Sequence, residues 1–369
     1  MVNHRILVIS YSDFSGIRNS IVTALKKHGC DVVEEKHTLR HLNLRPFYAF
    51  LMIVNAVAVY GIKYKRYIYH TPIANWVHGK ANQVIVNHHK NVNAVISLPK
   101  IMNNFHRKKT KNLRYAILTD HSNLLSKKIP DYGIDIPEQA VCGSWNKIER
   151  TILSEQDQIF VMGSFVKESM IKDYRIDPKH VAVIGGGPNL DVDAERDGIE
   201  KDFSQHNILF VGLEPERKGL PVLRQAFQTV RGKFPKAQLH VVGISGGSEN
   251  GIIYHGKLKG EPLKKLFYSS QIFSLPSFRE PFGVVFVEAM WAKTVCIGTN
   301  LGAMPEIIED GMTGYIILPG DSVALAKRII YLFNNPGQMK DMAERGYRRA
   351  RKYYNWERSA QIILNSLFE

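Results

Sequence analysis

The residue types and spacing at positions 276–290, PSFREPFGVVFVEAM, suit phosphate and sugar chemistry. Glu280 and Glu288 are separated by seven residues, and a Pro-Phe-Gly turn lies between them. An apolar run precedes the turn, and the residues from Val284 onward have helical character. A strand–turn–helix unit of this kind presents unpaired backbone N–H groups and the positive end of a helix, which together suit a diphosphate.

The two acidic side chains of this stretch can bind what is attached to the diphosphate. Glu280 lies in the turn, where its carboxylate can accept hydrogen bonds from sugar hydroxyls. Glu288, within the helix, offers two acceptor oxygens to a ribose diol. A glycine in the turn lets the backbone approach a ligand closely. The expected donor-binding residues of the turn are Pro281, Phe282, Gly283 and Val284.

This stretch resembles the Glu-x7-Glu motif of the retaining glycosyltransferases of family 4 (glycosyl transferases group 1), which have the two-domain GT-B fold. Other landmarks of that family are matched in order, at 119–122, 160–189, 210–220, 252–277 and 296–321. The resemblance implies an α/β protein with two doubly wound, Rossmann-like domains that face each other across a cleft. It also implies transfer of a sugar from a nucleoside-diphosphate sugar with retention of anomeric configuration.

The resemblance assigns roles to individual side chains. It implies that Lys218 and Arg217 bind the diphosphate and stabilise the negative charge that grows there as the sugar–phosphate bond breaks. It implies that Glu280 is catalytic and that His121, in the segment TDHS, bonds a sugar hydroxyl or a developing charge. In the first domain, Gly16 is the glycine available to let the chain approach the donor.

Two features depart from common patterns. Where the family loop usually has arginine after Val-Gly, this sequence has Leu213, and the cations are instead Arg217 and Lys218.

Asp191 and Asp193 resemble the Asp-x-Asp of metal-dependent glycosyltransferases with the other common fold, but they follow a glycine run rather than a central strand. We therefore expect no metal site, because cationic side chains and a helix end can do the metal's work.

Short β-branched runs alternate with helix-length amphipathic stretches along the whole chain, which predicts parallel sheets covered by helices on both faces. Thirteen runs are strand candidates, and Val84–Val86 is one of them. The pattern restarts near residue 207, after a Gly-Gly-Gly-Pro hinge and a polar stretch. The predicted domains are an acceptor-side domain at 1–190 and a nucleotide-sugar domain at 191–345. The resemblance implies that a helix in 346–369 packs back on the first domain.

Composition bounds the class of protein. The chain has 369 residues, 44% of them hydrophobic and 22% charged, which is ordinary for a globular protein of about two domains. Its three cysteines lie far apart in sequence, which excludes a disulfide framework and a cysteine-based zinc site and fits a cytoplasmic location.

The net charge of +15 is concentrated in residues 1–190, which hold 26 Lys and Arg against 14 Asp and Glu. This asymmetry predicts an anionic partner, such as a membrane surface or a lipid-linked acceptor. No helix-turn-helix pattern, zinc knuckle or aromatic interleaving accompanies the charge, so nucleic acid is not an expected partner.

Two segments leave alternatives open. Pro46–Ile62 is strongly apolar, but its 17 residues are short for a bilayer span. It is either a buried helix of the first domain or a membrane-surface helix, since basic residues follow it up to Arg66. The basic run Arg107–Arg114 is either a solvated loop or a site of attraction for anionic lipid or a phosphorylated acceptor. Membrane contact by 46–66 would place the protein on the inner face of the membrane.

The expected function is transfer of a sugar from a UDP- or GDP-sugar to a hydroxyl of a lipid-linked or surface-polysaccharide saccharide, with no cofactor required. No second carboxylate is obvious at the first-domain side of the cleft, which favours a front-face route over a double displacement. Two rivals stay open: another enzyme of the same fold (a phosphorylase or a nucleotide-sugar epimerase), and a non-catalytic glycan- or membrane-binding module.

Overall fold

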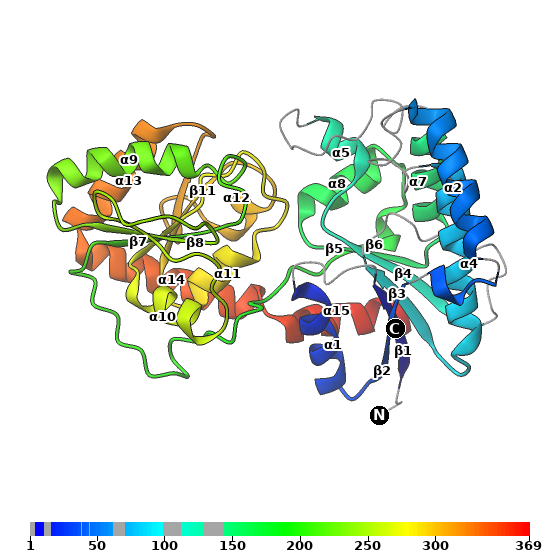
Figure 1. Cartoon of the computed structure of the whole chain (residues 1–369). Helices are drawn as coiled ribbons and strands as arrows, with labels where there is room; N and C mark the ends of the chain where they lie inside the picture. Colours follow the sequence, from blue (N-terminus) through cyan, green and yellow to red (C-terminus); the bar gives the residue numbers. More distant parts are fainter. Residues whose placement is uncertain are drawn as a thin grey trace. The chain divides into compact units, whose positions relative to one another are not determined.

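The structure, a computed structural model, describes residues 4–10, 16–37, 39–43, 45–61, 71–98, 112–128 and 144–369. The chain divides into two compact units (Figure 1). The first unit comprises the described residues up to Ile184 together with Glu357–Glu369, and the second comprises Gly185–Trp356. Each unit is built on its own six-stranded parallel sheet.

The sheet of the first unit has the strand order β2-β1-β3-β4-β5-β6. Its strands are β1 (Arg5–Ser10), β2 (Asp31–Lys36), β3 (Ala94–Leu98), β4 (Arg114–Thr119), β5 (Gln158–Val161) and β6 (Val181–Val183). All five residues of β3 are buried, as expected for a parallel strand that has helices over both faces of its sheet. The order reverses between β1 and β3, so the crevice at the carboxyl ends of these two strands is the topological switch point.

The helices of this unit come from both ends of the chain. They are α1 (Ile17–Lys27), α2 (Arg45–Tyr60), α4 (Pro72–His88), α5 (Asn123–Lys128), α7 (Ser144–Ser154), α8 (Ser164–Lys172) and α15 (Trp356–Phe368), with short 3-10 turns η2 (Leu39–His41) and η5 (Pro178–His180). The hydroxyl of Ser359 donates to the Ile184 carbonyl (2.9 Å), and Lys27 forms an ion pair with Glu357 (2.9 Å). These contacts fix α15 to the first unit although it is the last helix of the chain.

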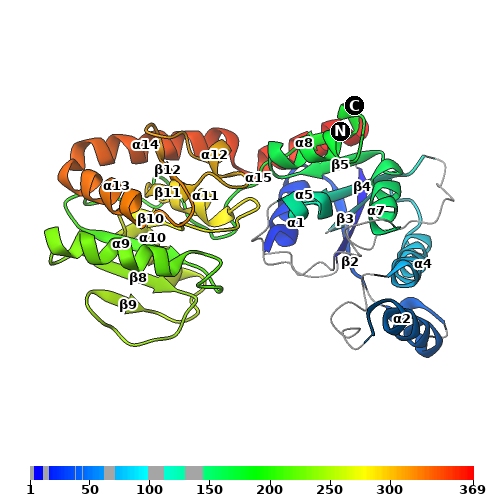
Figure 2. The same cartoon turned by 90° about the horizontal axis from the view of Figure 1, so that it is seen from above.

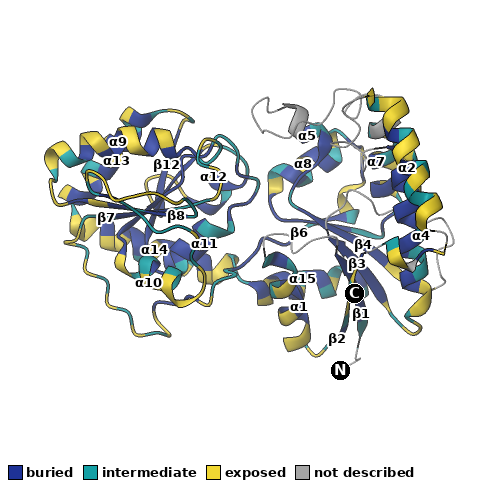
Figure 3. Cartoon of the chain, in the orientation of Figure 1, coloured by how far each residue is buried: buried dark blue, intermediate teal, exposed yellow. Residues whose placement is uncertain are grey.

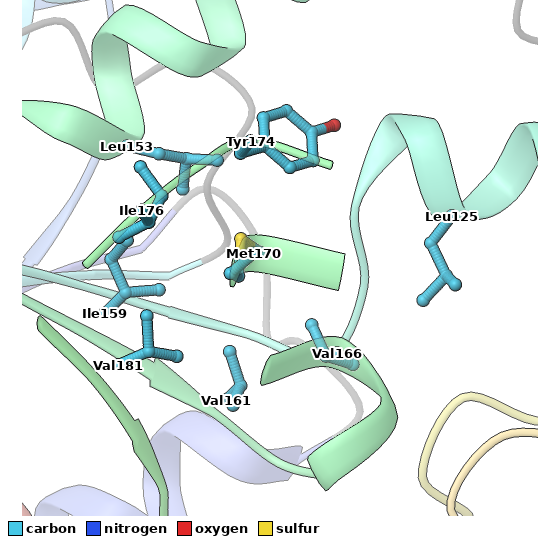
Figure 4. Packing of buried hydrophobic residues seen from close by; sticks show 9 residues of the cluster. All are labelled: Leu125, Leu153, Ile159, Val161, Val166, Met170, Tyr174, Ile176 and Val181. Carbon is cyan, nitrogen blue, oxygen red and sulfur yellow. The ribbon is translucent and has the colours of Figure 1, made fainter. Parts of the chain in front are cut away.

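A buried cluster beneath α5, α7 and α8 supports one end of the sheet (Figure 4). Its residues are Leu125, Leu153, Ile159, Val161, Val166, Met170, Tyr174, Ile176 and Val181. The hydroxyl of Tyr174 accepts a hydrogen bond from the Leu124 N–H (3.0 Å), and Glu149 accepts one from the Asn123 N–H (3.3 Å). The first residues of α5, which begins four residues after the end of β4, are therefore anchored to the core.

The sheet of the second unit has the order β12-β11-β10-β7-β8-β9. Its strands are β7 (Asn207–Val211), β8 (Gln238–Val242), β9 (Ile252–Tyr254), β10 (Ile272–Ser274), β11 (Val295–Thr299) and β12 (Gly314–Ile317). Its helices are α9 (Leu220–Lys233), α10 (Glu261–Ser269), α11 (Val284–Trp291), α12 (Met304–Ile307), α13 (Ser322–Asn334) and α14 (Pro336–Tyr353). The helices α9 and α13 lie side by side on one face, and α11 and α14 on the other (Figure 1). The switch point of this sheet lies between β7 and β10.

Twelve of the thirteen predicted strands are present, and Val84–Val86 is the exception, because it lies inside α4. The Thr71 hydroxyl accepts a hydrogen bond from the Ala74 N–H (3.0 Å) and Pro72 follows it, so a helix starts here and continues through the apolar run. Ile85 and Val86 pack toward the sheet, whereas Val84 packs toward α2. Residues 84–86 are all apolar because this part of α4 packs against the sheet on one side and against α2 on the other. Over three residues, such a run cannot be distinguished by sequence from a buried strand.

Of the apolar segment 46–62, residues 46–60 belong to the helix α2, as predicted, and Ile62 lies outside the described residues. The interpretation of this helix as buried is wrong for most of its surface. Only Met52 and Ala56 are buried. Figure 2 shows that α2 packs on α4, which lies between it and the sheet. None of the described helices is both long and apolar enough to cross a bilayer. Of the basic run, Arg114 begins β4, and Arg107–Lys111 lies outside the described residues.

A buried chain of polar side chains in the first unit predicts acid sensitivity. His37 donates from Nδ1 to Asn82 Oδ1 (2.6 Å) and accepts at Nε2 from His78 Nδ1 (2.6 Å). Burial, and then the nearby His37, lower the pKa of His78 to about 3. Because the unfolded state binds this proton near pH 6.5 and the folded state does not, stability falls as the pH falls below about 6.5.

We expect His78 to contribute about 2 kcal/mol to the loss of unfolding free energy between about pH 7 and pH 5. Urea unfolding at the two pH values, followed by circular dichroism, measures this loss. His78→Gln should reduce the acid-dependent loss, whereas His88→Gln, at an exposed histidine of the same helix, should leave it unchanged. Equal losses in the wild-type and His78→Gln proteins would contradict the assignment.

Candidate functional site

The turn that follows β7 brings two predicted cations to the switch point of the second sheet. Backbone hydrogen bonds from the Lys218 N–H to the Glu214 carbonyl (2.9 Å) and from the Gly219 N–H to the Glu216 carbonyl (3.1 Å) close the turn. Gly219 has φ 75°, and a Cβ at this position would lie 2.0 Å from the carbonyl oxygen of Pro276. Only glycine allows this turn to pack directly against the chain that leaves β10.

Lys218 and Glu280 form a buried ion pair. The Lys218 ammonium donates to the Glu280 carboxylate, and their side chains are only 13% and 9% exposed. The guanidinium of Arg217 donates to the Arg279 carbonyl (2.8 Å), and the Phe278 N–H donates to the Arg217 carbonyl (2.9 Å). The structure therefore brings together three residues predicted as catalytic, Arg217, Lys218 and Glu280, from two loops at neighbouring strand ends.

Glu214 belongs to this cluster but was missed by the sequence analysis. It accepts two hydrogen bonds from Arg217, at Nε (2.8 Å) and Nη2 (2.7 Å). Arg217 lowers the pKa of the Glu214 carboxyl, and hydrogen bonding to Glu214 raises the pKa of Arg217. The spacing of three residues within a turn was the available signal. The pairing fixes the plane of the guanidinium, so that Arg217 is oriented before any ligand arrives.

The turn at Pro281, Phe282 and Gly283 leads into α11, which begins at Val284. Phe282 is buried, and the Pro281 carbonyl accepts a hydrogen bond from the Ala303 N–H (3.0 Å). Gly283 has φ 79°, no side chain in the described ranges caps the helix, and its first turn contains no acidic residue. Its first N–H groups and the positive end of its dipole are therefore available to an anion near Lys218.

Glu288 lies in α11 but turns toward the backbone that enters the second unit. Its Oε1 accepts hydrogen bonds from the N–H groups of Asn189 (3.1 Å) and Leu190 (3.0 Å). Burial raises the pKa of Glu288 to about 7, and the two N–H donors oppose this rise. In this structure the carboxylate holds a chain segment in place, and ribose binding by Glu288 stays a prediction.

We expect Glu288→Ala to lose about 2 kcal/mol of unfolding free energy, because two partly buried N–H groups lose their acceptor. Glu288→Gln keeps an acceptor oxygen and should stay within about 1 kcal/mol of the wild type. The folded state holds a proton that the unfolded state releases between the ordinary pKa of 4.5 and about 7, so this contribution to stability falls as the pH rises through that window. Glu288→Gln should lack this fall. Urea unfolding at several pH values measures both effects, and an Ala variant as stable as the wild type would contradict them.

The two predicted site residues of the first unit lie at carboxyl ends of its sheet. His121 is buried two residues after β4, and its N–H donates to the Thr119 hydroxyl (3.3 Å). Gly16 is the N-cap residue of α1, the helix that follows β1, and has φ 80°. Because β3 separates β1 from β4, the two residues follow strands about 10 Å apart. They belong to the first unit, whereas the other predicted site residues belong to the second.

Asp191 and Asp193 do not converge. Asp193 is buried and accepts from the Tyr347 hydroxyl (2.8 Å) and from Arg351, so it ties the incoming chain to α14. Asp191 is exposed and pairs with Arg196 (2.7 Å). Among the described residues, no group of three or more His, Cys, Asp or Glu side chains is arranged to hold a metal ion.

A groove of about 560 Å³ opens beside the turn that contains Lys218. Glu216, Leu220 and Arg224 line it from the turn and α9, and Ser245 and Tyr254 line it from the loop after β8 and from β9. It lies at the carboxyl ends of parallel strands, where ligands of open α/β sheets bind. Its apolar and polar lining can hold a ring with hydrogen-bonding edges.

The sequence is similar to those of known glycosyltransferases. Residues 191–349 match the family described as Glycosyl transferases group 1. The chain is 26% identical over 243 residues to D-inositol 3-phosphate glycosyltransferase of Corynebacterium kroppenstedtii, covering 58% of this chain and 54% of that protein. It is 30% identical over 168 residues to phosphatidyl-myo-inositol mannosyltransferase of Mycobacterium leprae, covering 42% and 45%. The chain thus spans about half the length of the curated relatives it matches.

A solved structure shows the same fold over the whole chain. HepE of Anabaena, in complex with UDP and glucose, has a TM-score of 0.65 and 14% identity and matches 99% of each chain. The protein therefore has the GT-B fold, and residues 191–349 match the Glycosyl transferases group 1 family. The predicted fold class and family resemblance are confirmed at this level, and retention of configuration stays a prediction.

Proposed function

We propose that this chain, with its group 1 glycosyltransferase domain at residues 191–349, transfers a sugar from a nucleoside-diphosphate sugar to an acceptor hydroxyl. The observation that carries the proposal is the buried Lys218–Glu280 pair beside the start of α11, at the switch point of the second sheet. A cation and a helix start at one place fit a diphosphate, and a carboxylate next to them fits the attached sugar.

In the proposed mechanism, Lys218 and Arg217 bind the diphosphate, and α11 directs its N–H groups at the same charge. As the sugar–phosphate bond breaks, negative charge grows on the leaving phosphate, and these fixed donors stabilise it without reorganising. Glu280 orients the Lys218 ammonium and accepts hydrogen bonds from sugar hydroxyls. The groove beside α9 is the proposed place of the nucleoside. The sugar of the HepE complex, glucose with UDP, makes UDP-sugars the first donors to test.

We propose that the reaction retains the anomeric configuration by a front-face route. The leaving phosphate oxygen takes the proton of the acceptor hydroxyl as that hydroxyl attacks the anomeric carbon from the same face. Charge stabilisation then comes from side chains and backbone, so the proposed reaction requires no metal cofactor. Nuclear magnetic resonance of the product's anomeric proton tests retention, and a trapped glycosyl-enzyme adduct would defeat the front-face route.

The proposed acceptor is a lipid-linked or surface-polysaccharide saccharide. The mannosyltransferase of Mycobacterium leprae, by its name, acts on a phosphatidylinositol lipid, and the basic first unit fits an anionic acceptor of this kind. His121, buried at the carboxyl end of β4, is the proposed sugar-binding residue of that unit, with Gly16 as the place of close backbone approach.

A panel of UDP- and GDP-sugars tests the donor. We expect one member to raise the melting temperature and to be slowly hydrolysed, with release of nucleoside diphosphate that accelerates when acceptor is added. Release that requires inorganic phosphate would indicate a phosphorylase, and conversion of the sugar without acceptor an epimerase. Binding of glycan with no binding of any nucleotide sugar in calorimetry would indicate a non-catalytic module.

A further inference from the structure

The outward face of α2 is apolar and exposed to solvent. Five side chains along it are between 40% and 61% exposed: Phe47, Phe50, Ile53, Val54 and Val57. In Figure 3 most of the ribbon of α2 has the colour of exposed residues. Arg45, at its first position, is the helix's one charged residue. Exposed apolar side chains on soluble proteins are usually scattered, so a contiguous strip marks a surface that meets another phase or partner.

The packing of the described residues does not use this face. Met52 and Ala56 are buried on the opposite side of α2, and Met52 packs with Val77 and Ala81 of α4. Packing on α4 therefore uses one side of the helix. Nothing in the described part of the chain covers the other side enough to bury it.

The sequence on both sides of α2 is strongly basic, which favours an anionic surface as the partner. Residues 36–119 contain fourteen Lys and Arg residues and no Asp or Glu. Among the described side chains, Arg40 precedes α2, Arg45 begins it, and Lys80 lies on the neighbouring α4. A protein partner for so uniformly basic a region would have to be acidic and apolar at once, whereas an anionic leaflet offers both properties together.

Aromatic side chains mark the depth at which such a helix would lie. Trp76 of α4 contacts Tyr48 of α2 (ring centroids 5.8 Å apart), and the Lys80 ammonium lies 4.7 Å from the Trp76 ring centroid. Rings of this type favour the level of the lipid headgroups. The 16 residues of α2 span about 24 Å, less than the roughly 30 Å hydrocarbon core, so the helix fits the plane of the interface and not a span.

We propose that α2 docks on an anionic lipid surface. Phe47, Phe50, Val54 and Val57 enter the boundary between headgroups and acyl chains, and the basic side chains around the helix contact anionic headgroups. This inference rests on the proposed function in one respect only: docking would hold the first unit beside a lipid-linked acceptor.

Sedimentation of the full chain with vesicles tests docking. We expect binding to phosphatidylcholine vesicles that contain about 30% phosphatidylglycerol, weak binding to phosphatidylcholine alone, and a loss when potassium chloride rises from about 0.05 M to 0.5 M. Phe50→Glu and Val54→Glu should each weaken binding at least tenfold. Val323→Glu is the matched control, because Val323 is equally exposed (62%) on α13 of the second unit, and it should bind as the wild type does.

Two results would overturn the proposal. One is wild-type binding that Phe50→Glu and Val54→Glu both leave unchanged, or no binding at all. The other is a lipid-free dimer in sedimentation velocity that Phe50→Glu dissociates, since a second copy would then cover the face. Quenching of Trp76 fluorescence by brominated lipid, lost in Trp76→Phe, should place α4 at the headgroup level.

Donor hydrolysis measured without vesicles separates this inference from the proposed function. Phe50→Glu should hydrolyse donor as the wild type does while failing to bind vesicles. If the wild type hydrolyses donor but does not bind anionic vesicles, the docking proposal is contradicted and the proposed function is not. If the wild type binds vesicles through α2 but hydrolyses no nucleotide sugar, the proposed function is contradicted and the docking proposal is not.

Discussion

Lys218→Met should lose about 10²–10³-fold in turnover with nucleotide sugar, because the buried cation that meets the leaving diphosphate is removed. The Glu280→Gln protein should lose a similar factor, since the ammonium loses its orienting partner and the sugar loses an acceptor. The two side chains touch, so the double variant should be little worse than either single variant. Initial rates of nucleoside diphosphate release in the presence of acceptor measure all three.

The matched control for this prediction is Lys264→Met. Lys264 is also 13% exposed and also forms an ion pair, with Asp197 (2.7 Å), but it lies on α10 outside the candidate site. It should keep wild-type turnover. Equal turnover of Lys218→Met and Lys264→Met would show that Lys218 only stabilises the fold. Melting temperatures of the two variants show whether loss of an ion pair has unfolded either protein.

Gly302→Ala should damage both stability and turnover, because Gly302 sets the position of Glu280. It has φ 57°, and a Cβ there would lie 1.9 Å from the Glu280 carbonyl oxygen and 2.8 Å from that of Pro281. The backbone that presents Glu280 must therefore shift. We expect a loss of about 3 kcal/mol or more in unfolding free energy and about 10²-fold in turnover.

Gly311→Ala isolates the contact from the conformational strain. Gly311 has φ 73°, similar to that of Gly302, but no atom of the residues that the structure describes lies within 4 Å of its added Cβ. It should lose only about 1 kcal/mol, the cost of a left-handed non-glycine residue, and keep its turnover. If both variants behave alike in urea unfolding and in the rate assay, then the close approach to Glu280 does not position the site.

The sequence predicted the local features of this protein because they depend on neighbouring residues. β-branched runs bounded by glycine and polar residues identified twelve strands. The Pro-Phe-Gly turn and the residue pair Arg217-Lys218 located the two loops that meet at the second switch point. The same local logic failed at Val84–Val86, where residues of one helix face two neighbours and imitate a strand.

Long-range packing decided the rest. The partner of a buried charged side chain can lie far from it in the sequence. Glu288 accepts hydrogen bonds from backbone N–H groups 99 and 98 residues away, and Lys218 pairs with Glu280, 62 residues away. Likewise, α2 is apolar in sequence on every side, and only its packing on α4 shows which side the fold uses. Periodicity and turn chemistry act over a few residues, whereas the burial and pairing of a charge depend on whatever the folded chain places against it.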